Sequence, residues 1–242
     1  MPMRLHYYAA AIGLIVFMIS ACSSTVHTHR NAHYREPSEN SWHHRTQRVI
    51  NIRAYNALYE SIDVKNKILQ KWHSGRSGRY MEPKYITIHS TQNVSIGSGA
   101  MQHAKAFKNN PSKAKSWHFS VDQDIAVQHL PDNEQANHAE NWGAGRGQGN
   151  QTSIGIEMCE DLGNSIPMTI DKTARLTAFL MHRHQIPLSN VVPHYHWPRK
   201  EGGHKFCPRI LLEEDGKPGQ KWRQFQRQVD HYYQNVFMVP HH

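Results

Sequence analysis

The sequence predicts an α/β fold in which one mixed central β-sheet is flanked by helices. Four short runs of β-branched and apolar residues have the length and alternation of strands, and two longer stretches place apolar residues at helical spacing. The folded part is predicted to span residues 49–242, about 190 residues, which is the length of one domain with a single core. The sequence contains no internal repeat.

The first 21 residues are predicted to be an export signal. Arg4 is followed by an apolar stretch at residues 9–21, which is too short for a permanent transmembrane helix but typical of a signal-peptide core. Small residues stand directly before Cys22, as in the lipobox of bacterial lipoproteins. We therefore expect lipid on Cys22 and a lipid-anchored protein of the cell envelope; an ordinary secretory signal is the alternative. In a Gram-negative host, Ser23 in place of aspartate favours the outer membrane, facing the periplasm.

Residues 22–48 are predicted to be the lipidated N-terminus and a flexible tether, because they are rich in His, Ser, Asn, Thr and Arg and contain few aliphatic side chains. The whole chain carries 28 Lys and Arg against 19 Asp and Glu, a net charge of +9. Such a charge suits an anionic envelope. The basic residues are dispersed and form no recognised nucleic-acid module, so nucleic acid is not an expected partner.

The secondary-structure elements of this domain are predicted as follows. A helix lies near residues 54–72, where four aliphatic side chains recur at roughly helical spacing, and glycines and serines end it. A second helix covers residues 171–184, with Asp171 as its N-cap and Pro187 just beyond its end. The predicted strands lie near residues 85–89, 117–121, 125–129 and 153–158.

Candidate metal ligands are His89, His194 and Cys207. They lie on separate segments, the first in a predicted strand and the others in a later loop, so the fold must bring them together. Two imidazoles and one thiolate form a ligand set for one zinc ion whose fourth position stays open to water. His196 and His204 stand near enough in the sequence to compete for the second position, but we expect both to be surface histidines.

Candidate catalytic residues are Glu157 and Lys205. Glu157 ends a run that predicts a short buried strand, where a carboxylate is costly without a partner or a purpose. Beside a metal, such a carboxylate can take a proton from water and pass it to a leaving amine. Lys205 stands two positions before Cys207 and can stabilise the oxyanion of a tetrahedral intermediate. The alternatives are an edge-strand glutamate facing water and an exposed loop lysine.

A linked set of motifs resembles the zinc-dependent N-acetylmuramoyl-L-alanine amidases of the type 2 amidase family, which are related to peptidoglycan recognition proteins. The motifs are residues 85–91, 116–122, 127–131, 138–139, 152–159 and 191–208. The resemblance implies that His89, His194 and Cys207 bind zinc in a cleft at one side of the sheet. It also implies that Glu157 is the acid/base carboxylate and that Lys205 is a catalytic lysine.

In one interval the chain departs from the family pattern. His194 and Cys207 are 207 − 194 = 13 positions apart, several more than the family usually has. The added residues around 198–203 are polar and contain glycine, so a bulged loop can absorb them. We keep His194 as the second ligand because it lies three residues before Trp197, where the family's ligand lies relative to a similar tryptophan.

Three further residues have open roles. Cys159 is a packed core thiol, a disulfide partner of Cys207 or an extra ligand; we prefer the core thiol, because a disulfide would remove the thiolate that zinc needs. By analogy with the family, Asn93 and His138 contact the substrate. A local turn and a packed histidine explain these two residues equally well.

The predicted function is hydrolysis of the amide bond between N-acetylmuramic acid and L-alanine, in peptidoglycan or its fragments, by a monomer that carries one Zn²⁺. The chain has both the acid/base carboxylate Glu157 and the candidate ligand Cys207, which favours a catalytic protein over a binding module. One alternative is a non-catalytic peptidoglycan-binding module, suggested by the enlarged loop before Cys207. Another is a zinc peptidase that cuts within the stem peptide. The expected partners are peptidoglycan or muropeptides and, through the lipid on Cys22, a membrane.

Overall fold

The computed structural model describes residues 49–143 and 147–238. The predicted export signal, Cys22 and the predicted tether lie outside the described residues. Among the helices of the described ranges, none is both long enough and apolar enough to cross a membrane.

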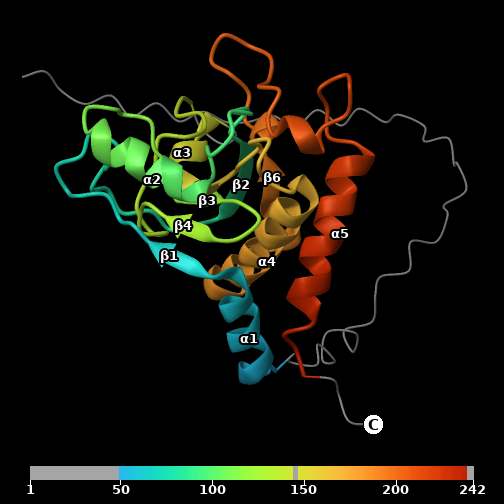
Figure 1. The fold of residues 1–242 in the computed structure, drawn as a ribbon. Coiled ribbons are helices and arrows are strands. Elements are labelled where there is room, and N and C mark those ends of the chain that lie inside the picture. The colour runs from blue at the N-terminus through green and yellow to red at the C-terminus, as the bar shows by residue number, and fades with distance from the viewer. Residues whose placement is uncertain (1–48, 144–146, 239–242) are drawn as a thin grey trace, which may run out of the picture. The chain divides into compact units, whose positions relative to one another are not determined.

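A six-stranded mixed β-sheet forms the centre of the fold, in the order β1-β4-β3-β5-β2-β6 (Figure 1). Its strands are β1 (Val64–Asn66), β2 (Tyr85–Ser90), β3 (Phe119–Val121), β4 (Ala126–Gln128), β5 (Ser153–Met158) and β6 (Val191–Pro193). The neighbours β3 and β4 run antiparallel, whereas β3, β5, β2 and β6 run parallel to one another. The carboxyl ends of these parallel strands therefore meet at one edge of the sheet, where open α/β sheets bind their ligands.

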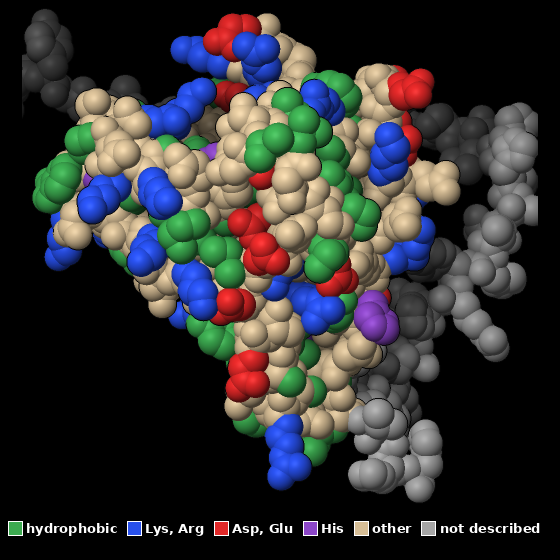
Figure 2. Space-filling view, in the orientation of Figure 1, with side chains coloured by type: hydrophobic (Ala, Val, Ile, Leu, Met, Phe, Trp, Pro, Cys, Tyr) green, Lys and Arg blue, Asp and Glu red, His purple; other side chains and the backbone are tan. Residues whose placement is uncertain are grey.

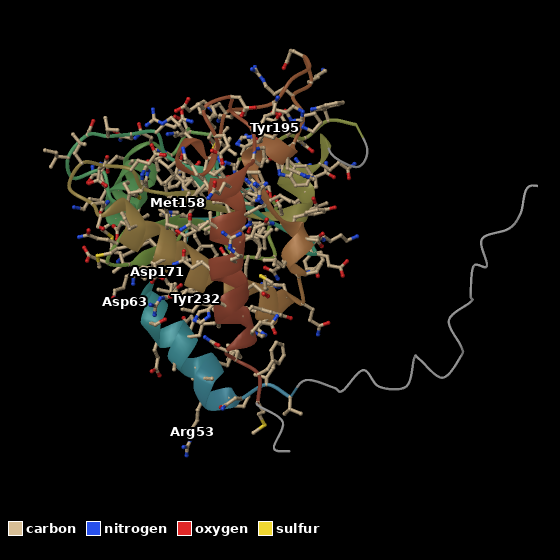
Figure 3. The ribbon with its side chains drawn as sticks, turned by 90° about the vertical axis from the view of Figure 1, so that its right-hand side faces the viewer. Arg53, Asp63, Met158, Asp171, Tyr195 and Tyr232 are labelled. Carbon is tan, nitrogen blue, oxygen red and sulfur yellow. The ribbon has the colours of Figure 1, made fainter. Side chains whose placement is uncertain are left out.

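Helices pack around this sheet, so the predicted α/β fold is confirmed. The α-helices are α1 (Ile52–Ile62), α2 (Ala100–Asn109), α3 (Gly149–Thr152), α4 (Ile166–His184) and α5 (Gln220–Gln234). Short 3-10 turns lie at η3 (Leu188–Asn190), η4 (His194–His196) and η5 (Arg209–Leu211). Helices α4 and α5 run side by side (Figure 1). Asp171 of α4 joins them by accepting hydrogen bonds from Tyr232 Oη at 2.6 Å and Gln228 Nε2 at 2.7 Å (Figure 3).

Strand alternation separates a core face from a site face. The even-numbered apolar residues of β2 and β5 belong to the large hydrophobic core that also contains apolar side chains of α4 and α5. These residues are Ile86, Ile88, Ile154, Ile156 and Met158. Because successive side chains of a strand point to opposite faces, Thr87, His89, Gly155 and Glu157 point to the other face. Helix α2 packs on β3 and β4, and its Ala100 shares a small cluster with Val127. The site is therefore built on the face away from the main core.

The helix predicted near residues 54–72 is wrong in its second half. The Asn51 side chain caps α1 by accepting from the backbone N–H groups of Arg53 and Ala54. The helix ends where Asp63 adopts a left-handed conformation with φ of 55° (Figure 3), and the chain continues as edge strand β1. Leu69 instead packs against Phe107 in a separate small cluster, so its agreement with helical spacing is coincidental.

The predicted N-cap of the second long helix is also wrong. Helix α4 begins five positions earlier than predicted, at Ile166, with Ser165 at the N-cap position, and Asp171 instead binds α5. The strand predictions are confirmed, with β3 and β4 shorter than expected. Helices α2, α3 and α5 and strands β1 and β6 were not predicted. In α5 the buried side chains Trp222, Phe225 and Val229 recur at helical spacing, a signal that could have revealed this helix.

Candidate metal centre and active-site pocket

His89, His194 and Cys207 lie together at the carboxyl edge of the sheet. His89 is near the end of β2, His194 directly follows β6, and Cys207 follows in the loop after that. One potential ligand atom from each residue lies within 4.8 Å of the others, and all three residues are buried. The Cys207 Sγ to His89 Nδ1 distance is 3.8 Å. The prediction that the fold brings these residues together is confirmed.

The two histidines have the protonation state of metal ligands, and His194 also has unpaired ring nitrogens. Both ring nitrogens of His194 are buried and have no hydrogen-bond partner among the described residues. Burial and the charge of Lys205 lower the pKa of His194 to about 3. Burial, together with the charges of neighbouring His and Lys side chains, also lowers the pKa of His89 well below its ordinary value. Both imidazoles are therefore neutral at physiological pH and can offer lone pairs to a cation.

His138 fixes which nitrogen of His89 faces the cluster. The His138 Nε2 lies 3.1 Å from the Ser153 carbonyl oxygen, which can only accept, so Nε2 carries a proton. Burial lowers the pKa of His138 well below its ordinary value, so its Nδ1 is unprotonated and accepts from His89 Nε2 at 2.8 Å. His89 is then protonated at Nε2, and its Nδ1 keeps the lone pair that faces Cys207. His138 thus orients a candidate ligand, as second-layer partners of metal-binding histidines commonly do.

Gly155 makes room for His138 on the sheet. A Cβ atom at position 155 would lie only 2.6 Å from His138 Nδ1, closer than real contacts allow. The Asn150 side chain further fixes this segment by accepting from the backbone N–H groups of His138 and Ala139. The hydrogen-bond chain to His89 therefore depends on glycine at this position of β5.

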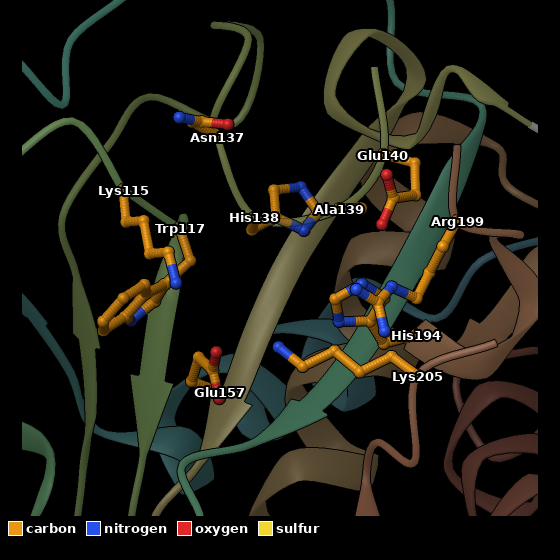
Figure 4. Close-up of a pocket in the computed structure, with 10 residues that line it drawn as sticks. All are labelled: Lys115, Trp117, Asn137, His138, Ala139, Glu140, Glu157, His194, Arg199 and Lys205. Carbon is orange, nitrogen blue, oxygen red and sulfur yellow. The ribbon is translucent and has the colours of Figure 1, made fainter. Parts of the chain in front are cut away.

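A cavity of about 470 Å³ opens beside the candidate ligands, and it contains both predicted catalytic residues (Figure 4). Glu157 and Lys205 line it together with His138 and His194. Glu157 is paired in register with His89, and its Oε1 lies 4.0 Å from His89 Nδ1. Figure 4 shows the Lys205 side chain extending toward Glu157. The Glu157 carboxylate, the Lys205 amine and the candidate ligand His194 thus face one space.

Glu157 has the electrostatic environment of an acid/base group. Its side chain is 16% exposed, and Oε2 is buried without a hydrogen-bond partner among the described residues. Burial raises the pKa of Glu157 to about 7, while the charges of Lys205 and Lys115 oppose this rise. A carboxyl group that titrates near neutral pH can both accept and return a proton. The alternative of a glutamate on an edge strand is wrong, because β5 is an inner strand.

The other residues considered from the sequence lie apart from the metal cluster. Cys159 is a buried free thiol that packs with Ala100 and Val127, as expected for a core thiol. His204 is exposed and its Nδ1 lies 2.6 Å from the Tyr195 carbonyl oxygen, whereas His196 is half-buried against aromatic rings. Among the described residues, the three-residue group with metal-site geometry includes none of these.

Of the two residues expected to contact the substrate, only His138 lines the pocket. Asn93 is exposed, and its Oδ1 accepts from the backbone N–H of Ser95 at 3.1 Å. This geometry agrees with the local turn that the sequence left open as its alternative role.

Comparison with known proteins identifies the family. Residues 79–210, more than half of the chain, match the family described as N-acetylmuramoyl-L-alanine amidase. This chain belongs to that family. The matched segment contains strands β2 to β6 of the sheet. It also includes the three candidate ligands and both candidate catalytic residues, Glu157 and Lys205.

Two curated relatives of this amidase-family chain come from Bacillus subtilis (strain 168). The chain is 44% identical over 140 residues to N-acetylmuramoyl-L-alanine amidase XlyA. The aligned residues cover 58% of this chain and 44% of XlyA. It is 40% identical over 153 residues to N-acetylmuramoyl-L-alanine amidase CwlH, and the aligned residues cover 63% of this chain and 58% of CwlH. The chain therefore spans about half the length of the curated relatives it matches.

A solved structure shares this amidase-family fold. The catalytic domain of XlyA superposes with a TM-score of 0.60 and 38% sequence identity, covering 69% of this chain and 99% of that domain. The similarity is thus to essentially the whole of one catalytic domain.

Replacing His138 with Phe tests the hydrogen-bond chain to the candidate ligand. An aromatic ring is kept, but His89 Nε2 and the Ser153 carbonyl lose their partner. We expect the affinity for a divalent metal to fall by about 10- to 100-fold, as it does when second-layer partners are removed. Competition with a chromophoric chelator measures this affinity. His129→Phe, at another buried histidine outside the ligand group, is the matched control and should leave metal affinity unchanged.

Proposed function

We propose that this chain hydrolyses the amide bond between N-acetylmuramic acid and L-alanine in peptidoglycan or its fragments. One observation carries this proposal: Glu157, whose Oε2 has no hydrogen-bond partner among the described residues, lines the same pocket as His194, whose two ring nitrogens also have none. His194 in turn forms the candidate metal cluster with His89 and Cys207. The names of the two curated relatives support the choice of bond.

Zinc is the metal that best fits the donor set. Neutral imidazole nitrogens and a cysteine sulfur are its preferred ligands, and three protein ligands with one open position are typical of catalytic zinc. The 3.8 Å separation of Cys207 Sγ and His89 Nδ1 suits two ligands of one tetrahedral ion, for which bond lengths of about 2.3 and 2.1 Å predict a separation of about 3.6 Å. We therefore propose that the cluster holds one Zn²⁺ during catalysis.

The residues of the pocket divide the work of amide hydrolysis. When bound, zinc supplies an activated water at neutral pH and polarises the scissile carbonyl. The Glu157 carboxylate accepts a proton from the attacking water and returns it to the departing nitrogen, which is a poor leaving group until protonated. The Lys205 amine stabilises the negative charge that develops on the carbonyl oxygen. His138 holds His89 in the ligating tautomer throughout.

For the N-terminal segment we propose export and lipid attachment at Cys22, which would hold the enzyme at the cell envelope. The support is the apolar stretch at residues 9–21 and the small residues before Cys22. Metabolic labelling with a clickable fatty acid tests this proposal. Label should appear on the full chain and be lost in Cys22→Ser; equal labelling of both proteins would contradict it.

Zinc binding should release at least one proton between pH 6 and 8. Burial raises the pKa of Cys207 to about 12 in the metal-free protein, so the thiol is protonated there, whereas bound zinc requires the thiolate. His89 and His194 are already neutral and release none. The affinity should therefore rise at least about tenfold per pH unit. Calorimetry in buffers of different ionisation enthalpy counts the protons. Ionisation of the zinc-bound water near pH 7 adds to the proton from the thiol, and a count of zero would contradict this ligand set.

Release of soluble fragments from purified sacculi tests the proposed catalysis. The zinc-loaded protein should solubilise peptide material, chelation should abolish the release, and added zinc should restore it. Binding to sacculi without any release in the presence of zinc would instead support the non-catalytic module.

A further inference from the structure

The catalytic pocket contains more positive charge than the proposed chemistry requires. Besides Lys205, the basic residues Lys115 and Arg199 line it. The carboxylates of the lining are Glu140 and Glu157. Three cations therefore face two carboxylates. Bound zinc would add further positive charge.

Lys115 and Arg199 stand on different walls of the pocket. In Figure 4 Lys115 lies beside Trp117 on one side, and Arg199 lies on the other side near His194 and Glu140. Within the described residues Lys115 has no ion pair. Arg199 Nε lies 4.0 Å from Glu201 Oε2, and both side chains are more than half exposed, so this pair is loose. Both cations are thus available to a ligand.

Arg199 reaches the pocket because of the enlarged loop before Cys207, drawn in orange at the top of Figure 1. The loop is a hairpin closed by a bridge between Pro198 and His204, and the Arg199 N–H donates to the Gly203 carbonyl at 3.0 Å. Gly202 and Gly203 have φ values of 90° and 74°, the left-handed conformation that glycine adopts readily. The additional residues of this interval therefore build a defined turn.

The base of this hairpin is tied to the segment that follows the pocket residue Glu140. Trp142 Nε1 donates to the Pro198 carbonyl at 3.0 Å, and His204 stacks on Tyr195 with ring centroids 4.4 Å apart. Arg199, one residue beyond Pro198, consequently lines the pocket, whereas its neighbour Lys200 does not.

We propose that Lys115 and Arg199 form a carboxylate-binding subsite that selects acidic stem peptides. This inference rests on the proposed function and names its substrate class: muramoyl peptides with free carboxylates on the residues beyond L-alanine. A stem in which these carboxylates are amides lacks the charge that both cations recognise. Arg199 can bind a carboxylate through two parallel N–H groups, and Lys115 binds as a point charge.

Cleavage rates of two substrates test this subsite. The zinc-loaded full chain is given a muramoyl peptide with free carboxylates beyond alanine and the same peptide with these groups amidated, and kcat/KM is measured for each. Wild type should prefer the acidic peptide by about tenfold or more, the effect of one hydrogen bond to a charged group. Arg199→Gln and Lys115→Gln should each lower this ratio, mainly through KM, and Arg199→Lys should restore part of it.

Lys200→Gln is the matched control, because it removes one positive charge from the same hairpin outside the pocket. It should keep the wild-type ratio. Equal kcat/KM for the two peptides in wild type, or an equal ratio in wild type and Arg199→Gln, would overturn the subsite while leaving the amidase proposal intact. Failure to cleave either peptide would overturn both.

Discussion

Glu157→Gln should lower kcat by about a hundredfold to ten-thousandfold, the range that general acid–base groups contribute. The amide has nearly the shape of the carboxylate but cannot accept the proton of the attacking water or return it to the leaving nitrogen. Because Glu157 is not one of the three candidate metal ligands, the zinc content of the variant should remain that of wild type. Steady-state kinetics on a muropeptide, with zinc content measured on the same samples, check both expectations.

The matched control for this substitution is Glu160→Gln. Glu160 is a nearby buried carboxylate, but it pairs with Arg209 at 3.0 Å and does not line the pocket. Its replacement should lower stability while leaving kcat within a few fold of wild type. A large loss of kcat in Glu160→Gln, or its absence in Glu157→Gln, would contradict the assigned acid/base role.

Stability should respond to Glu157→Gln in the opposite direction from activity. Burial raises the folded-state pKa of Glu157 to about 7, so above its unfolded value the ionised form opposes folding. In zinc-free protein, the melting temperature of Glu157→Gln should therefore exceed that of wild type at pH 8, with a smaller difference at pH 5. This trade between stability and function is common at active sites.

Cys207→Ser should lower zinc affinity by more than about a hundredfold, since loss of second-layer partners alone costs 10- to 100-fold. A serine hydroxyl at this position does not supply the anionic sulfur, and His89 and His194 alone leave the ion with two protein ligands. Zinc should no longer raise the melting temperature, because this rise reflects binding to the folded state. Activity should be lost together with the metal.

Cys159→Ser controls for the loss of a buried thiol as such. Cys159 is also a buried free thiol, but it packs in the small cluster beneath α2 and not with the ligands. This variant should bind one zinc like wild type and melt at a lower temperature, because it buries a hydroxyl among apolar side chains. Loss of zinc from both variants would argue against Cys207 as a specific ligand.

The central strands could be predicted because their signals are local, whereas the metal cluster could be predicted because its residues follow the family pattern. The alternation around residues 85–89 and 153–158 reports a strand pattern directly, and the order of His89, His194 and Cys207 follows the family pattern. The extent of α1 could not be predicted, since the left-handed turn at Asp63 overrides a spacing that continues to Leu69.

The supporting residues of the site depend on contacts that no local pattern reports. His138 orients His89 only because β5 places Gly155 and the Ser153 carbonyl against its ring. Arg199 reaches the pocket only because the enlarged interval forms a hairpin held by Trp142. The positive charge itself is scattered in the sequence, and Figure 2 likewise shows Lys and Arg side chains distributed over the visible face.

Mass spectrometry of the products from defined muropeptides tests the central claim most directly. The zinc-loaded protein should release stem peptides that begin with free L-alanine and leave N-acetylmuramic acid without a peptide, and neither product should form with Glu157→Gln or with zinc-stripped protein. Products cut within the stem peptide would contradict the amidase assignment, and unchanged cleavage by the zinc-stripped protein would contradict the metal centre.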